Sequence, residues 1–216
     1  MRAGVRRASI PVTAAVVAAL LLSGCGGKDT ASSGTGQGAP QGQGQGAQPG
    51  QTPATGSDGA KAAAVLDRSV PQQVAIPSLG VTSKLETLGQ NKDGTMTTPK
   101  NPDLAGWYEP GPTPGSEGPA VIAGHVTWNG DDAVFQGLKT LQAGDAVEVT
   151  RQDGKKAMFT VERVAEYPKK EFPTLEVYKN VDHAALRLVT CGGDFDADRH
   201  YYPNNVVVYA RMTSVA

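Results

Sequence analysis

The sequence of 216 residues is poor in cysteine and carries no marked excess of positive charge. It holds only two cysteines, which excludes a small scaffold cross-linked by many disulfides. The formal net charge of −1 differs from the basic excess of most nucleic-acid-binding domains, so we expect no nucleic acid as a partner. No apolar run reaches the roughly 18 residues of a membrane-spanning helix, which excludes a protein with several membrane spans.

The N-terminus, residues 1–25, has the pattern of an export signal. Three arginines precede a mostly apolar stretch over residues 8–22, which is short for a membrane span. The stretch ends in Leu-Ser-Gly-Cys25, which resembles the lipobox of bacterial lipoproteins, where cleavage before the cysteine is coupled to its lipidation. We therefore expect Cys25 to carry a lipid anchor; an ordinary secretory signal or an uncleaved anchor helix is the alternative. Each reading puts the rest of the chain on the extracytoplasmic face of the cell membrane, lipid-anchored or signal-anchored.

Residues 26–66 have the composition of a tether. From Gly26 to Ala60 there are eleven Gly, six Gln and three Pro, and no aromatic residue, Leu, Ile or Val. Such a segment buries too little apolar surface to offset the entropy lost on ordering, so we predict a disordered Gly/Gln/Pro-rich linker. A binding motif made of the Gly-Gln run is the alternative.

The remaining residues, 67–216, are numerous enough for one domain with a single core. Helical periodicity is weak, and short helical turns fit only residues 132–138 and 172–178. Asp153-Gly154 between two strand-like runs predicts a hairpin. The pattern favours an all-β barrel or sandwich with one or two short helices. The predicted strands are β-branched runs between turn residues, at 73–76, 83–88, 120–126, 146–151, 157–167, 185–190 and 206–212.

Two of these apolar strands end in residues suited to nucleophilic catalysis. One runs into Gly124-His125, and the other ends at Cys191, which two glycines follow. If Cys25 is lipidated, Cys191 is the only thiol left, and an unpaired thiol is unusual in an exported protein. A thiolate attacks carbonyl carbon while a nearby His holds or transfers the proton, so the pair is compatible with an enzyme. A small thiol that only packs in the core is equally compatible.

Amide cleavage through a thioester also calls for a cation that stabilises the developing oxyanion. Arg199 lies eight residues past Cys191, on the segment that leads into the last strand. Arg187 lies four residues before Cys191, which on a strand is the same face. Either could reach the thiolate. A salt bridge in the loop for Arg199, or sheet-face packing for Arg187, would explain each residue without catalysis.

Further motifs, collinear from Val70 to Arg211, resemble the sortase family and, in detail, the class F sortases of actinobacteria. The segments that carry the resemblance are Ile76-Pro-Ser-Leu-Gly-Val81, Ala105-Gly-Trp-Tyr108, Gly118-Pro-Ala-Val-Ile-Ala-Gly-His125, Leu186-Arg-Leu-Val-Thr-Cys-Gly-Gly193 and Asn205-Val-Val-Val-Tyr-Ala210. They cover essentially the whole of the expected folded domain.

The resemblance implies an eight-stranded sortase-type β-barrel with the activity of a cysteine transpeptidase. Such an enzyme cleaves a sorting signal such as Leu-Pro-x-Thr-Gly between Thr and Gly and transfers the protein to an amine. Matched motif by motif, Cys191 is the nucleophile that forms the acyl-thioester. His125 protonates the leaving amine and deprotonates the incoming one.

The family Arg is the least secure of the matched residues. In other sortases it stands at the start of the last strand, where this chain has Asn205. Arg199 is the only Arg between Cys191 and that strand, so we predict Arg199 as the catalytic cation. Arg187 is kept as the alternative, and Arg187 and Thr190 are predicted to bind substrate.

The partners implied are a sorting-signal peptide of secreted proteins, a cell-wall precursor or other amine acceptor of a Gram-positive-type cell, and the membrane through the N-terminal anchor. We expect a monomer and no cofactor. No metal site is expected either, because no His lies at ligand spacing from a Cys or another His. An L,D-transpeptidase also pairs Cys with His, but its Ser-His-Gly-Cys signature is not matched by Val189-Thr190-Cys191. A sortase-like lipoprotein that acts as a peptide hydrolase, or only binds peptide, is the remaining alternative.

Overall fold

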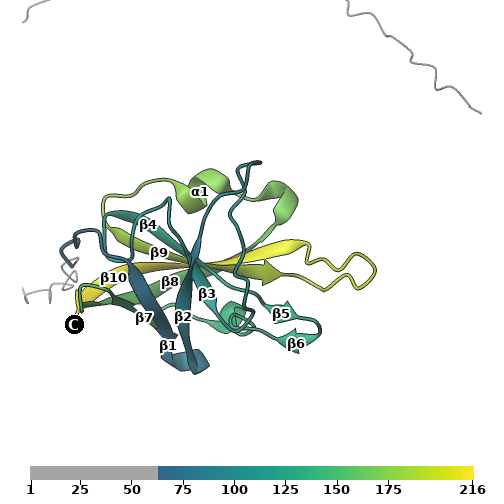
Figure 1. The fold of residues 1–216 in the computed structure, drawn as a ribbon, viewed down its shortest axis with the longest axis horizontal. Coiled ribbons are helices and arrows are strands. Elements are labelled where there is room, and N and C mark those ends of the chain that lie inside the picture. Colours follow the sequence, from purple (N-terminus) through teal and green to yellow (C-terminus); the bar gives the residue numbers. More distant parts are fainter. Residues whose placement is uncertain (1–62) are drawn as a thin grey trace, which may run out of the picture. The chain divides into compact units, whose positions relative to one another are not determined.

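The computed structural model describes residues 63–216, which form an all-β domain around one closed barrel (Figure 1). Its eight strands follow the order β1-β2-β3-β4-β9-β10-β8-β7. This order confirms the predicted eight-stranded barrel and decides against the sandwich. The predicted signal peptide over residues 1–25, Cys25 and the linker as far as residue 62 lie outside the described residues.

Most elements of the domain are short, except for the long strands β8 and β10, and helices are few. The barrel strands are β1 (Pro71–Ile76), β2 (Val81–Leu88), β3 (Ala105–Tyr108), β4 (Gly118–Ala123), β7 (Ala146–Arg151), β8 (Lys156–Pro168), β9 (Ala184–Gly192) and β10 (Asn204–Val215). A separate small sheet pairs β5 (Thr127–Trp128) with β6 (Asp131–Asp132). The helical turns are η1 (Pro77–Leu79), η2 (Leu138–Thr140), η3 (Lys169–Glu171) and α1 (Thr174–Tyr178).

The seven strands expected from the sequence are all present, and β3 completes the barrel as an eighth. The sequence pattern did not predict β3, because this strand has only four residues, one of them Gly106, and no β-branched residue. The glycine is needed there, since a Cβ at this position would lie 2.5 Å from Cγ of Leu88 on the neighbouring strand. β3 runs parallel to β2 and antiparallel to β4.

The expected helical turns have mixed outcomes. Residues 172–178 contain α1, as predicted. The turn predicted over residues 132–138 is confirmed in part: Asp132 pairs with Thr127 in the small sheet, but the N–H of Gln136 donates to Ala133 and that of Leu138 to Phe135, and these turns lead into η2. The predicted hairpin is confirmed: β7 and β8 are antiparallel neighbours, and Gly154 has the positive φ of 80° that their tight turn requires.

β4 and β9 are the most deeply buried strands and carry the two motifs of interest. They lie side by side in parallel, and every residue of β4 is buried. One face of this pair belongs to the barrel interior, through side chains such as Ile122 and Leu188. The opposite face forms a second apolar cluster that includes Val121, Val189 and Val177 of α1. Parallel strands with both faces covered read as continuous apolar runs, which is how these two appear in the sequence.

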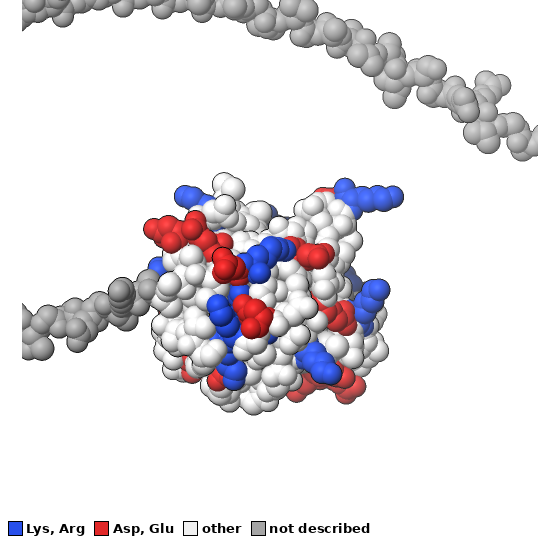
Figure 2. Space-filling view, turned by 60° about the vertical axis from the view of Figure 1, so that its left-hand side comes forward, with Lys and Arg blue, Asp and Glu red and all other residues white. Residues whose placement is uncertain are grey.

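The surface of the domain carries charges of both signs. On the face shown in Figure 2, Lys and Arg side chains are interspersed with Asp and Glu. Exposed ion pairs such as Arg211 with Glu162 (3.0 Å) and Lys156 with Glu148 (2.9 Å) join neighbouring strands. Pairs of this kind add little to stability, so the fold depends on its apolar core. Within residues 63–216, no helix has the length and apolarity to cross a membrane.

Candidate active site

The ends of β4 and β9 bring the predicted nucleophile and base to the same edge of the barrel. In the parallel register Ala123 lies opposite Val189, and the N–H of Gly124 donates to the carbonyl of Val189 at 3.0 Å. The ladder ends at this pair, and His125 and Cys191 each follow two residues later along their chains. Both residues line the same pocket.

Thr190 locks these two strand ends together. Its side-chain hydroxyl donates a hydrogen bond of 2.8 Å to the carbonyl of Gly124, directly before the histidine. The residue is 5% exposed, so the bond is shielded from water. Thr190 was predicted to bind substrate; in the structure its hydroxyl is already engaged, although the residue also forms part of the pocket wall.

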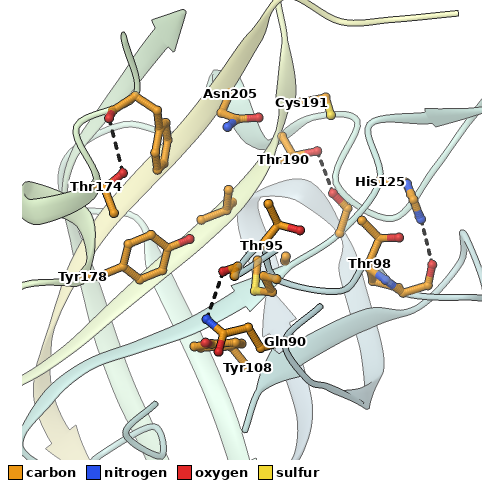
Figure 3. Close-up of a pocket in the computed structure, with 17 residues that line it drawn as sticks. Gln90, Thr95, Thr98, Tyr108, His125, Thr174, Tyr178, Thr190, Cys191 and Asn205 are labelled. Atoms are coloured by element: carbon orange, nitrogen blue, oxygen red, sulfur yellow. Dashed lines mark hydrogen bonds between the residues drawn. The ribbon is translucent and has the colours of Figure 1, made fainter. Parts of the chain in front are cut away.

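His125 is held in a defined orientation. Its Nε2 lies 2.9 Å from the carbonyl oxygen of Pro99, which can only accept, so Nε2 carries the proton. In the neutral ring Nδ1 is then the nitrogen with a free lone pair, able to take up a proton. The ring also packs against Trp128, with the centroids 4.9 Å apart and the planes tilted by 59°. The half-buried imidazole is thus fixed on two sides, and Figure 3 shows the hydrogen bond of its ring.

Cys191 is half-buried and has no cysteine partner among the described residues. Its side chain borders two hollows, one of about 540 Å³ that it shares with His125, and one of about 250 Å³ on the other side. The thiol also has a cationic neighbour that the sequence analysis did not single out: Nζ of Lys169 lies 3.5 Å from Sγ. Lys169 is 22 positions away in the chain, and no spacing rule links it to the cysteine.

The larger hollow is a groove whose walls are mainly apolar (Figure 3). Burial, with a smaller effect of neighbouring Tyr108, raises the pKa of Tyr178, so its hydroxyl stays protonated at neutral pH and can donate a hydrogen bond. An apolar trough with a few polar groups suits an extended peptide with apolar side chains. The apolar walls come from Met96, Tyr108, Ala123, Phe172, Tyr178 and Val189, and the polar groups from Gln90, Thr95, Thr98, Thr174 and Asn205.

The second hollow approaches the thiol from the side of the loop between β9 and β10. Its lining is more polar and includes Thr127, Gln136 and Asp194. Thr127 is within 2.8 Å of the hydroxyl of Tyr202, a bond that joins the small sheet to this loop. Cys191 is therefore open to two different surroundings, one apolar and one polar.

The structure does not bring either predicted arginine to the thiol. The side chain of Arg199 is 80% exposed, and its Nε lies 3.7 Å from the carboxylate of Asp196, the salt bridge that was its alternative explanation. Arg187 is 6% exposed and stacks on the ring of Tyr209 at 4.5 Å. It does share a face with Cys191, but four residues of strand separate them by about 13 Å.

A metal role finds no support in the geometry of the described residues. Across residues 63–216, no three His, Cys, Asp or Glu side chains come together as a group that could hold an ion. Nδ1 of His183 lies 3.0 Å from Oδ1 of its neighbour Asp182. His183 does not line either of the two hollows that Cys191 borders. The chemistry that this site can support is that of a thiol, an imidazole and a nearby ammonium group.

Comparisons with known proteins agree with this picture. A model of the family described as the sortase domain matches residues 74–213. Solved structures of similar fold include sortase A of Listeria monocytogenes (TM-score 0.50, 18% identity, 69% of this chain and 90% of that chain). A lid mutant of sortase A from Corynebacterium diphtheriae is another (TM-score 0.52, 16% identity, 69% of this chain and 73% of that chain). A third is sortase C2 of group B Streptococcus pilus island 1 (TM-score 0.52, 18% identity, 69% of this chain and 76% of that chain). At these identities the likeness concerns the fold. No curated protein sequence matches the chain.

Proposed function

Because the chain belongs to the sortase domain family, a family of cysteine transpeptidases, we propose that it is itself an active transpeptidase with Cys191 as nucleophile and His125 as acid and base. The observation that carries the proposal is the parallel register of β4 and β9. Through it, two motifs 66 residues apart in sequence are joined by the bond from Thr190 to Gly124. A core thiol with no catalytic role would not need a histidine fixed in the same open groove.

The reaction proceeds in two steps that use the same pair of residues. The thiol proton of Cys191 passes to His125, and Sγ attacks the carbonyl carbon of the scissile peptide bond, so that a C–S bond forms. The C–N bond then breaks as His125 gives that proton to the leaving amine. In the second step His125 takes a proton from an incoming amine, whose nitrogen attacks the thioester; the C–S bond breaks, and His125 returns the proton to the sulfur.

The substrate proposed is a sorting signal of the Leu-Pro-x-Thr-Gly kind, bound along the apolar groove. The aromatic and aliphatic walls of the groove suit the Leu-Pro part, and the threonine carbonyl would then lie at Cys191. The acceptor proposed is an amine of a cell-wall precursor or of another protein, which the polar hollow on the far side of Cys191 leaves room to approach. The collinear motifs noted in the sequence support assignment to class F.

The place of action proposed is the outer face of the cell membrane. The support is the sequence alone: the apolar N-terminal stretch that ends at Cys25, followed by the Gly-rich tether. Two acyl chains on Cys25 would hold the chain stably, since each buried CH₂ contributes about 0.8 kcal/mol. The tether would let the domain reach substrates about 35 Å from the membrane.

Two single-cysteine variants of the full-length chain test the enzymatic proposal. The chain is incubated with a library of sorting-signal peptides, with and without an added amine, and the products and any adduct are identified by mass spectrometry. We expect cleavage and a transient acyl adduct on Cys191 in the wild type, and neither in Cys191→Ala. Cys25→Ala is the matched control and keeps both.

Three results of this assay would contradict parts of the proposal. Product formation by Cys191→Ala would refute the mechanism. Release of the peptide acid even when amine is in excess would make the protein a hydrolase. Peptide binding without cleavage or any adduct would show that the protein binds sorting peptides but does not catalyse a reaction.

A further inference from the structure

The cation that faces the nucleophile in this protein is a lysine from a different element than the family arginine. We infer that Lys169 is a catalytic residue whose ammonium group stabilises the thiolate form of Cys191, an inference that rests on the proposed function. Nζ lies 3.5 Å from Sγ, within the reach of a hydrogen bond to sulfur. Lys169 opens η3, directly after β8, whereas the family pattern puts its cation at the start of the last strand, here β10.

The position at the start of β10 is filled by a neutral residue. Asn205 lies directly opposite Cys191 in the antiparallel pairing of β9 with β10. An amide can accept or donate a hydrogen bond but supplies no net positive charge to a thiolate. The charge that this position lacks is supplied by Lys169 of η3. This turn follows β8, the strand on the other side of β10.

Lys169 is held in place by its backbone and by its side chain. Pro168 pairs with Asn204 at the end of the β8–β10 ladder, and the N–H of Lys169 donates to the carbonyl of Pro203 at 2.9 Å. Its Nζ also lies 4.5 Å from the ring centroid of Tyr201, in a cation–π contact. An ammonium group with only these partners keeps donor capacity for the sulfur, since it has three N–H groups.

The other charged groups around the thiol do not replace Lys169. His125 shares the apolar groove with the thiol, and Lys139 and Asp194 line the polar hollow on its other side. Glu166 of β8 accepts a hydrogen bond from Asn204 at 2.6 Å. Within residues 63–216, Lys169 alone donates a hydrogen bond to Sγ.

The physical effect follows from charge. At neutral pH only a few per cent of an ordinary thiol is ionised, and the thiolate is the species that attacks. A positive charge within about 4–6 Å favours the ionised form of an acidic group. Lys169 is therefore placed to stabilise negative charge on Sγ. Removing the charge lowers thiol reactivity without removing the thiol.

The test measures thiol reactivity directly and needs no sorting peptide. The full-length chain with Cys25→Ala, which leaves Cys191 as the only cysteine, is alkylated with iodoacetamide across a range of pH, and the rate is followed by mass spectrometry. In Lys169→Met we expect the rate at pH 7 to fall about tenfold, with the rate–pH curve displaced to higher pH. Lys169→Arg retains the charge and most of the rate. Lys170→Met, which removes the next, exposed lysine, is the matched control and leaves the rate unchanged.

The outcomes separate this inference from the proposed function. An equal alkylation rate and pH curve in Lys169→Met and wild type would overturn the role of Lys169, whether or not the protein cleaves peptides. The expected loss of reactivity in a chain that never processes a sorting signal would retain the role of Lys169 and refute the transpeptidase. If Lys169→Met unfolds, as judged by circular dichroism, Lys169→Gln provides the second variant. It also removes the charge but keeps a polar side chain, and an unchanged alkylation rate in that variant would overturn the inference.

Discussion

The hydroxyl of Thr190 donates a 2.8 Å hydrogen bond to the carbonyl of Gly124, and so ties the residue before Cys191 to the residue before His125. Both partners are buried; Thr190 lies on β9, and Gly124 follows β4, the strand that pairs with β9 in the folded barrel. The bond therefore fixes the backbone on which the thiol and the imidazole stand.

Replacing Thr190 with Val should damage both stability and catalysis. The buried carbonyl of Gly124 loses its donor, which costs about 1–3 kcal/mol of unfolding free energy. Looser placement of the base against the nucleophile should lower kcat for peptide cleavage about tenfold. Thr190→Ser keeps the hydroxyl and should retain most of the unfolding free energy and most of kcat. Urea unfolding measures the first and steady-state kinetics the second. Wild-type kcat in Thr190→Val would show that the bond has no role in positioning.

Gly124 should not tolerate a side chain. A Cβ there would lie 2.6 Å from Cδ2 of Phe135 and 2.7 Å from Cγ1 of Val134, so the backbone before the histidine must move. We expect Gly124→Ala to lower the free energy of unfolding by about 1–3 kcal/mol and to reduce cleavage. Adding Val134→Ala should restore part of both. The matched control is Gly89→Ala, since a Cβ at Gly89 meets nothing within 4 Å.

Arg187 should be dispensable for catalysis. Burial lowers the pKa of its guanidinium, and its Nε has no hydrogen-bond partner in the described part of the chain. Arg187→Met removes an unfavourably desolvated charge but also the contact with Tyr209, effects of opposite sign. We expect the free energy of unfolding to change by less than about 1 kcal/mol and cleavage to persist. Loss of cleavage in a stable variant would restore the original expectation that Arg187 binds substrate.

The stability of the domain in acid should depend on Asp153. A hydrogen bond from the buried guanidinium of Arg151 lowers the pKa of this carboxyl from 3.8 to about 2. A group with a depressed pKa stabilises the fold above its unfolded value and loses that contribution as pH falls through its folded value. Thermal unfolding should therefore show a loss of stability between about pH 4 and pH 2 that is smaller in Asp153→Asn. Identical pH curves for the two proteins would contradict this.

Arg151 has a further structural role, which a second variant tests. Its guanidinium donates to the carbonyl of Pro114 and, at 2.6 Å, to that of Asp67, and so fastens the segment before β1 to the barrel. Arg151→Met should cost roughly 1–3 kcal/mol for each carbonyl left without a donor. Chemical unfolding would measure the loss, and an unchanged unfolding free energy would contradict it. This variant leaves the groove untouched, so folded protein should keep its thiol reactivity.

Local patterns in the sequence were enough to predict the β-rich class, most of the strands and the two residues proposed as nucleophile and base. Alternating or continuous apolar runs such as those ending at His125 and Cys191 are local patterns, and they survive folding because both strands are buried on each face. Local patterns do not carry β3, because four residues that include Gly106 are defined by their neighbours across the sheet. The same reason explains why the turn predicted from residue 132 begins one residue later, since Asp132 pairs across the small sheet with Thr127.

The groups that surround the thiol depend on contacts between strands that are distant in the sequence. Proximity in sequence favoured Arg199 and strand alternation favoured Arg187, yet one lies in solvent and the other stacks on Tyr209. Lys169 reaches the sulfur because the end of β8 lies beside the start of β10, which in turn pairs with β9. Contacts across a closed barrel depend on register and closure, and these are properties of the assembled sheet, which no single segment encodes.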